Sequence, residues 1–191
     1  MKGPPGKVRI IGGRWRGTRL AVPDAPGLRP TSDRARETLF NWLQPALPGA
    51  RVLDLFAGTG ALGIEALSRG AAEALLVERD AALARALEDS LRRLGAGTAA
   101  RVARADAVGL LAAPLHGRFD IVFVDPPFDA GLWPPTLAAL GPWVAEDAWL
   151  YVESPPEARL EPGPGWLAHR ESRSRDARHV LYRRAGGAGS G

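Results

Sequence analysis

The chain after residue 50 alternates short apolar segments with longer segments rich in alanine, leucine and arginine. The apolar segments have the length of buried strands, and the segments between them carry apolar residues at helical spacing. We therefore expect an α/β fold with a mainly parallel sheet and helices on both faces. The expected strands are 51–56, 74–78, 100–105, 119–124 and 149–153, and the expected helices are 61–69, 81–94, 107–113 and 132–140.

A different pattern precedes this alternation. Residues 1–48 predict a β-hairpin over 8–22, followed by a helix that is capped by Thr31 or Ser32 and ends near Leu43. We expect this segment to be a docking extension of the sheet domain.

The segment after the alternation predicts the last part of the sheet. Residues 166–170 and 177–182 have the composition of two further strands, which bring the expected sheet to seven. The sheet domain is therefore expected to span 49–184. Residues 185–191 are glycine, alanine and serine only, and we expect them to form a disordered tail.

Composition excludes several classes of protein. The 191 residues are 46% hydrophobic and 24% charged, which is ordinary for one globular domain. No apolar run approaches the roughly 18 residues that span a bilayer, and the N-terminus lacks a secretory signal, so we expect a cytoplasmic monomer without membrane contact. The absence of cysteine excludes thiol nucleophiles, and three scattered histidines argue against a metal site.

Basic charge is concentrated at the N-terminus. Residues 1–36 contain nine Lys or Arg against two acids, whereas the other residues contain 16 basic and 19 acidic side chains. Such a block suggests a polyanionic partner, because a guanidinium group can bind phosphate through two parallel hydrogen bonds. The alternative is a charged surface that is exposed only to solvent. Trp15 could either stack on that partner or pack on the core. The candidate contacts are Arg9, Arg14, Trp15, Arg16, Arg19, Arg29, Arg34 and Arg36.

A glycine-rich turn follows the first strand of the alternation. Gly58, Gly60 and Gly63 fit the G-x-G-x-x-G pattern of dinucleotide sites, and Glu78 ends the next strand. However, Asp54 lies at the C-terminal end of the first strand, one turn before the glycines, where its charge would repel phosphate. The turn therefore favours a ligand that carries a cationic amine.

S-adenosylmethionine is a ligand of that kind, since it carries an ammonium and no phosphate. Asp54 could bind the ammonium, Glu78 the ribose hydroxyls and Asp106 the adenine amine. Each acid also has a simpler interpretation: Asp54 as a turn residue, Glu78 as a helix cap and Asp106 as an N-cap. The candidate cofactor residues are Asp54, Phe56, Gly58, Thr59, Gly60, Glu78, Arg79, Asp106, Ala107 and Thr31.

A rigid acceptor site follows the strand 119–124. It consists of Asp125, Pro126, Pro127 and Phe128, our candidate catalytic residues. Proline limits backbone motion, so the Pro126 carbonyl and the Asp125 carboxylate are fixed acceptors for an amine, while Phe128 offers a face to a flat ring. An ordinary strand end with a Pro-Pro stop is the alternative.

These motifs resemble those of the Rossmann-like class I amino-methyltransferases. The segments 9–17, 28–43 and 60–70 are similar, more narrowly, to RsmD, the bacterial 16S rRNA guanine-N2 methyltransferase family. The resemblance covers nearly the whole chain. It implies a class I methyltransferase fold and methylation of a guanine, guanine 966 in the family, within 16S rRNA of the 30S subunit.

Three other functions compete with this interpretation. An adenine-N6 methyltransferase would need the same amine site, because that site does not by itself choose a base. An assembly factor could keep the fold without catalysis. A nicotinamide oxidoreductase fits least well, because neither Tyr151 nor Tyr182 lies beside the glycine loop in sequence.

Overall fold

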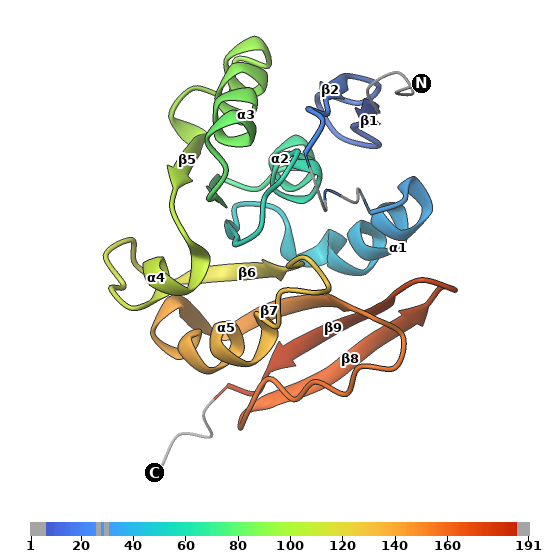
Figure 1. The fold of residues 1–191 in the computed structure, drawn as a ribbon, viewed down its shortest axis with the longest axis vertical. Coiled ribbons are helices and arrows are strands. Elements are labelled where there is room, and N and C mark those ends of the chain that lie inside the picture. Colours follow the sequence, from blue (N-terminus) through green and yellow to red (C-terminus); the bar gives the residue numbers. More distant parts are fainter. Residues whose placement is uncertain (1–6, 26–27, 29–30, 187–191) are drawn as a thin grey trace.

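The computed structural model describes residues 7–25, 28 and 31–186 (Figure 1). Its centre is a seven-stranded sheet of order β5-β4-β3-β6-β7-β9-β8, in which β3 to β7 are parallel and β9 is antiparallel to both neighbours. The predicted α/β class and strand count are confirmed. The strands are β3 (Arg51–Asp54), β4 (Glu73–Glu78), β5 (Ala100–Arg104), β6 (Phe119–Val124), β7 (Val144–Ser154), β8 (Trp166–Arg173) and β9 (Arg178–Arg184).

Helices cover both faces of the sheet, as predicted. Val52 and Leu53 are neighbours on β3 whose side chains enter two different cores, because successive side chains of a strand point to opposite faces. The first core contains residues of α1, α2 and α3, and the second contains residues of α4 and α5, on the other side of β6 (Figure 1). The helices are α1 (Asp33–Leu43), α2 (Ala61–Ser68), α3 (Ala81–Arg93), α4 (Ala107–Leu111) and α5 (Trp133–Ala139).

Most element ends lie within two residues of the predicted ones, and Ser32 caps α1. The largest difference is in β7, which begins at Val144 rather than Trp149. Its first half contains Glu146 and Asp147, which disfavour a strand in isolation, but Val144 is buried and pairs with Phe119 of β6. No helix in the described ranges is long and apolar enough to cross a membrane.

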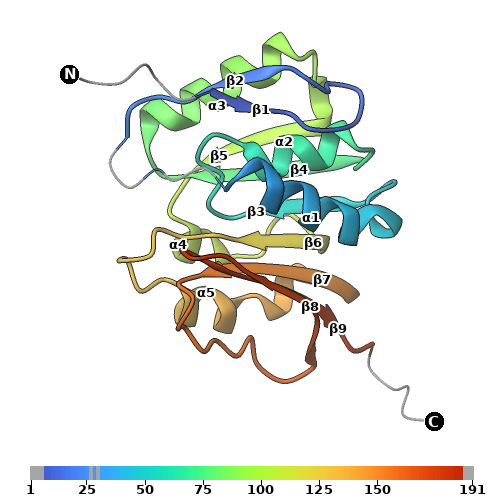
Figure 2. The ribbon, with the colours of Figure 1, turned by 90° about the vertical axis from the view of Figure 1, so that its right-hand side faces the viewer.

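The N-terminal hairpin shares a core with the sheet. Its strands, β1 (Lys7–Arg9) and β2 (Arg19–Ala21), are shorter than predicted and lie beside α3 (Figure 2). Val8, Ile10 and Leu20 are buried in the same core as α1 and α2. The segment that sequence analysis separates at residue 48 is therefore packed onto the sheet domain rather than tethered to it.

A buried carboxylate on α2 holds the hairpin in place. Glu65 is fully buried and accepts hydrogen bonds from the backbone N–H groups of Ile11 (2.9 Å) and Gly12 (2.8 Å). Its charge is matched by Arg69, at 2.8 Å, and Arg36, at 3.5 Å. Two backbone donors and two guanidinium groups thus compensate the cost of burying this carboxylate.

The hairpin turn also lies against the end of α2. Ser68 donates to the Gly12 carbonyl (2.6 Å) and accepts from the Trp15 N–H (3.0 Å). Gly13 has φ +78°, and a Cβ there would lie 1.9 Å from the Ser68 carbonyl oxygen, so only glycine allows this approach. The conformation of the turn is therefore determined by α2.

We predict that Glu65→Gln lowers the free energy of unfolding by about 3 kcal/mol, because it removes the charge that compensates buried guanidinium groups. Urea unfolding measures the effect. Glu88→Gln on the exposed face of α3 is the matched control and should change the same quantity by less than about 0.5 kcal/mol. Equal losses in the two variants would contradict this account of Glu65.

Candidate functional site

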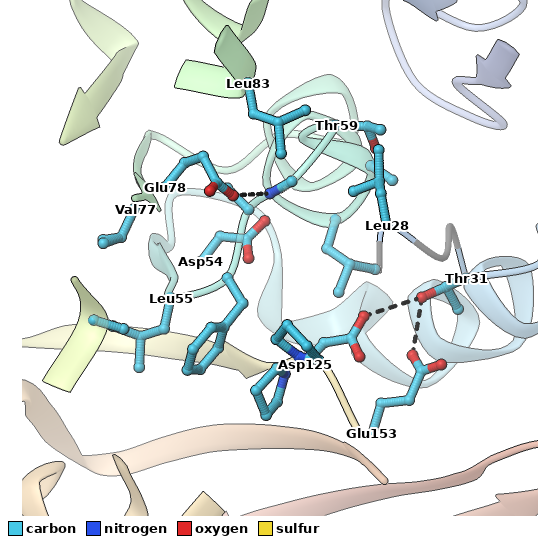
Figure 3. A pocket seen from close by; sticks show the side chains of 18 of the residues that line it. Leu28, Thr31, Asp54, Leu55, Thr59, Val77, Glu78, Leu83, Asp125 and Glu153 are labelled. Atoms are coloured by element: carbon cyan, nitrogen blue, oxygen red, sulfur yellow. Dashed lines mark hydrogen bonds between the residues drawn. The ribbon is translucent and has the colours of Figure 1, made fainter. Parts of the chain in front are cut away.

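A cavity of about 460 Å³ opens at the carboxyl edge of the parallel strands (Figure 3). Every candidate catalytic residue lines it, and so does every candidate cofactor residue except Gly60. Parallel strands end at one edge of the sheet, which brings together acids that are far apart in sequence. These acids are Asp54, Glu78, Asp106 and Asp125, and Glu153 of β7 joins them.

The glycine turn begins α2 without a side-chain cap. Gly60 is the N-cap residue with φ +82°, and a Cβ there would lie 2.6 Å from side-chain atoms of Ile64 and Leu87. Glycine is therefore required at this position for both backbone conformation and packing. Gly60 shapes the turn, while Gly58 and Thr59 line the cavity.

Asp54 is a buried carboxyl group below the glycine turn. It accepts a hydrogen bond from the Gly63 N–H at 3.0 Å. Its pKa is raised from 3.8 to about 7, chiefly by burial and in smaller part by the charge of Glu78, while the Gly63 hydrogen bond opposes both effects. A cationic group in the cavity would favour the ionised form, whereas a phosphate would disfavour it. The residues present therefore fit a ligand with an ammonium group.

Glu78 and Asp106 each have a structural partner as well as a place on the cavity wall. Glu78 accepts from the N–H groups of Gly58 (3.0 Å) and Asp80 (2.8 Å), so it holds the glycine turn against the end of β4. Asp106 accepts from the Gly109 N–H (2.8 Å) and caps α4, so it has the N-cap role as well as its place on the cavity wall. Asp80, rather than Glu78, caps α3. These hydrogen bonds use only part of each carboxylate, so both acids keep lone pairs for a ligand.

The candidate catalytic segment is held by its neighbours. The Phe128 ring packs against Trp133 of α5, with ring centroids 5.8 Å apart, and the Trp133 indole N–H donates to the Glu153 carbonyl (2.9 Å). Pro126 is buried, while Asp125 and Phe128 are partly exposed. The segment thus presents a carboxylate and an aromatic ring on a fixed backbone.

A threonine joins two carboxylates at this end of the cavity. The Thr31 hydroxyl lies 2.9 Å from Glu153 Oε2 and 3.4 Å from Asp125 Oδ2 (Figure 3). Sequence analysis places Thr31 among the cofactor residues, but its hydroxyl bonds to the acids beside the Pro-Pro segment. It borders the cavity between those acids.

Sequence analysis missed Glu153 and His179, which also line the cavity. Glu153 lies at the end of the fifth parallel strand, so the argument used for the other four acids would have found it. His179 lies on β9, an antiparallel strand that pairs with β7, and only the sheet topology shows that it is near Glu153. The described residues contain no group of three or more His, Cys, Asp or Glu that could hold a metal ion.

Within the described residues, the candidate RNA-binding arginines of the N-terminal segment do not line the cavity. Of these seven arginines, five are exposed on the hairpin and α1, and one, Arg29, lies outside the described residues. Arg36 does not fit the expectation, because it is 1% exposed. It pairs with Asp33 (2.7 Å) and Glu65 instead of facing solvent. The exposed arginines are Arg9, Arg14, Arg16, Arg19 and Arg34.

Trp15 packs against the core that contains α1 and α2 and is only partly exposed. The Arg14 guanidinium lies over its ring, 4.0 Å from the ring centroid. Of the two interpretations of Trp15, the structure therefore supports packing. Stacking on a base would require Arg14 to move.

Comparisons with known proteins agree with the geometry. Residues 8–184 match the family model described as Conserved hypothetical protein 95. The chain is 50% identical over 182 residues to ribosomal RNA small subunit methyltransferase D of Escherichia coli K12, with 94% of this chain and 91% of the relative covered. It is 39% identical over 181 residues to the protein of the same name from Haemophilus influenzae, with 93% and 94% covered.

A solved structure shows the same architecture. The Escherichia coli protein yhhF matches with a TM-score of 0.87 at 46% sequence identity, over 95% of this chain and 99% of that chain. This match and the strand order confirm the Rossmann-like class I methyltransferase fold. The chain therefore belongs to the RsmD family, the ribosomal RNA small subunit methyltransferases D.

Proposed function

We propose that this protein transfers a methyl group from S-adenosylmethionine to the exocyclic N2 amine of one guanine in 16S rRNA, within the assembled 30S subunit. By the family resemblance, the nucleotide is guanine 966. One observation carries the proposal: the candidate amine-binding segment 125–128 and the acid Asp54 line the same cavity. Methyl transfer needs its donor and its acceptor side by side in this way.

The cavity suits S-adenosylmethionine, which when bound supplies an electrophilic methyl carbon on a sulfonium. Asp54 would hold the ammonium, which compensates a carboxylate that burial otherwise disfavours. Glu78 would accept the ribose hydroxyls, and Asp106 the adenine amine. Arg79, Ala107, Phe56 and Thr59 line the same space.

The residues 125–128 would orient the target amine. Its lone pair is delocalised into the guanine ring, so the nitrogen is a poor nucleophile until its hydrogens are held. Asp125 through its carboxylate and Pro126 through its carbonyl would accept those hydrogens and stabilise the positive charge that develops on nitrogen. Phe128 would stack on the base.

The substrate would be a base in an RNA loop rather than in a duplex. A base must leave its stack to enter the cavity, and loops make this easy. The exposed arginines Arg9, Arg14, Arg16, Arg19 and Arg34 would bind the surrounding phosphates. Because the hairpin is packed on α2 and α3, such contacts would have a fixed position relative to the cavity.

The proposal is tested with 30S subunits from a strain that lacks this enzyme. The subunits are incubated with the protein and labelled S-adenosylmethionine, and the rRNA is then digested to nucleosides. We expect label in N2-methylguanosine. Label in N6-methyladenosine would favour the adenine rival, and absence of label would contradict methyl transfer to this substrate.

We predict that Asp125→Ala lowers the rate of methyl transfer at least about 100-fold, because the amine loses its charged acceptor. Calorimetric titration should show cofactor affinity within about twofold of the native value. Asp129→Ala, at an exposed position in the next turn, is the control and should keep activity. Substantial activity in Asp125→Ala would remove Asp125 from the mechanism.

We predict that affinity for S-adenosylmethionine falls as pH decreases below about 7, by up to about tenfold per pH unit. Since the pKa of Asp54 is raised to about 7, lowering the pH protonates the carboxyl and removes the charge that binds the ammonium. Calorimetry between about pH 7.5 and 5.5 measures this slope.

Two controls isolate Asp54 in that experiment. 5′-Methylthioadenosine lacks the ammonium, so its affinity should not follow the titration of this carboxyl. Asp54→Asn should bind S-adenosylmethionine weakly at every pH in the range. The same slope for both ligands would show that Asp54 does not contact the ammonium.

We predict that replacing Arg14 and Arg16 with Gln weakens binding to 16S rRNA. Each phosphate that the protein no longer binds should lower the slope of log affinity against log salt by about 0.7, which gives up to about 1.4 for the pair. Cofactor affinity should not change. The control removes two exposed arginines, Arg159 and Arg170, near the opposite edge of the sheet. An equal loss in the control would indicate a general charge effect instead of docking by the hairpin.

A further inference from the structure

Glu153 has no role in the function proposed so far, although it lies beside the candidate catalytic segment. It is the second-last residue of β7, is 8% exposed and lines the cavity close to Asp125 (Figure 3). A carboxylate this deeply buried usually has a defined partner or a function.

Two hydroxyl groups fix one oxygen of this carboxylate. Thr31 donates to Oε2 at 2.9 Å, and Tyr151 donates to the same oxygen at 3.0 Å. Burial raises the pKa of Tyr151 well above its usual value, so the phenol keeps its proton and remains a donor. His179 Nδ1 lies 2.8 Å from the Tyr151 oxygen and holds the phenol from its other side.

The second oxygen, Oε1, differs from Oε2 in its hydrogen bonding. Within the described part of the chain, no hydrogen bond is formed with Oε1, although Glu153 lines the cavity. Both carboxylates line the same cavity, and the Thr31 hydroxyl that donates to Glu153 also lies 3.4 Å from Asp125 Oδ2. A flat ligand whose amine is held by Asp125 would therefore have a second, fixed acceptor nearby.

Guanine matches this pair of acceptors and adenine does not. On its Watson–Crick edge guanine presents two neighbouring donors, the N2 amine and N1–H. Adenine presents its N6 amine beside N1, which is an acceptor. A carboxylate oxygen next to the amine site would bind the N1–H of guanine and would repel the N1 lone pair of adenine.

We propose that Glu153 is the residue that selects guanine, by accepting a hydrogen bond from N1–H while Asp125 holds the neighbouring N2 amine. This inference rests on the proposed amine methylation and adds the group that chooses the base. Thr31, Tyr151 and His179 act as positioning residues, since the hydroxyl groups of Thr31 and Tyr151 hold Oε2 and His179 holds the Tyr151 phenol.

The test uses RNA in which the target guanine is replaced by 2-aminopurine. This base keeps the amine at C2, but its N1 is an acceptor. The native protein should methylate guanine at least about 100-fold faster than 2-aminopurine, because a fixed acceptor rejects a base that lacks the donor. Equal rates on the two RNAs would overturn the proposal without any variant being made.

The variant Glu153→Gln provides a second test of the base preference. The hydroxyl groups of Thr31 and Tyr151 would hold the amide oxygen, so the amide NH₂ would face the cavity as a donor. The preference for guanine over 2-aminopurine should then fall at least about 100-fold, through a slower rate on guanine and a faster one on 2-aminopurine. A uniform loss on both RNAs would indicate a structural role and contradict the proposal.

Controls separate this inference from the proposed function. Glu146→Gln, an exposed change on the same strand, should leave the guanine preference unchanged. RNA with inosine at the target site has N1–H but no amine and should receive no methyl group. If the native protein fails to methylate guanine N2, the proposed function fails; if it methylates guanine and the preference does not move in Glu153→Gln, only this inference fails.

Discussion

The structure depends on the convergence of five parallel strands, β3 to β7, at one edge of the sheet. Each strand brings an acid to that edge or to the residue or two after it, so carboxylates that would repel one another surround a single cavity. Backbone N–H groups of the glycine turn and hydroxyl groups of Thr31 and Tyr151 stabilise them. At Asp54 the hydrogen bonds do not fully compensate the cost of burying a carboxylate charge, because its pKa is raised to about 7. A cationic ligand would supply the remaining compensation.

The same fold connects the cavity to the basic surface through one short helix. α2 follows its N-cap residue Gly60, in the turn that lines the cavity, and it carries Glu65 and Ser68, which hold the hairpin. A surface that binds RNA phosphates would therefore be rigidly placed relative to a cavity that binds a base. The arrangement explains why Arg36, although part of the basic block, is used inside the protein.

Sequence patterns were sufficient for the fold and most of the cavity, for identifiable reasons. Strand and helix periodicity depends on local side chains, and glycine and proline mark the turns, so the sheet and the segment 125–128 were predictable. Glu153 followed the same rule but was overlooked, whereas its link to His179 depends on the antiparallel strand β9. The burial of Arg36 and the packing of Trp15 on the core depend on how the hairpin lies against α2, and no local sequence pattern encodes that arrangement.

The central claim is that one cavity holds the methyl donor and a guanine amine together. A crystal structure with a bisubstrate compound, in which guanosine N2 is joined by a carbon chain to the sulfur-bearing side of adenosylhomocysteine, tests it directly. We expect the linked nitrogen to lie within hydrogen-bonding distance of Asp125 or the Pro126 carbonyl, and the ribose to lie at Glu78. A guanine bound outside the cavity, or an adenosine remote from Glu78, would contradict it.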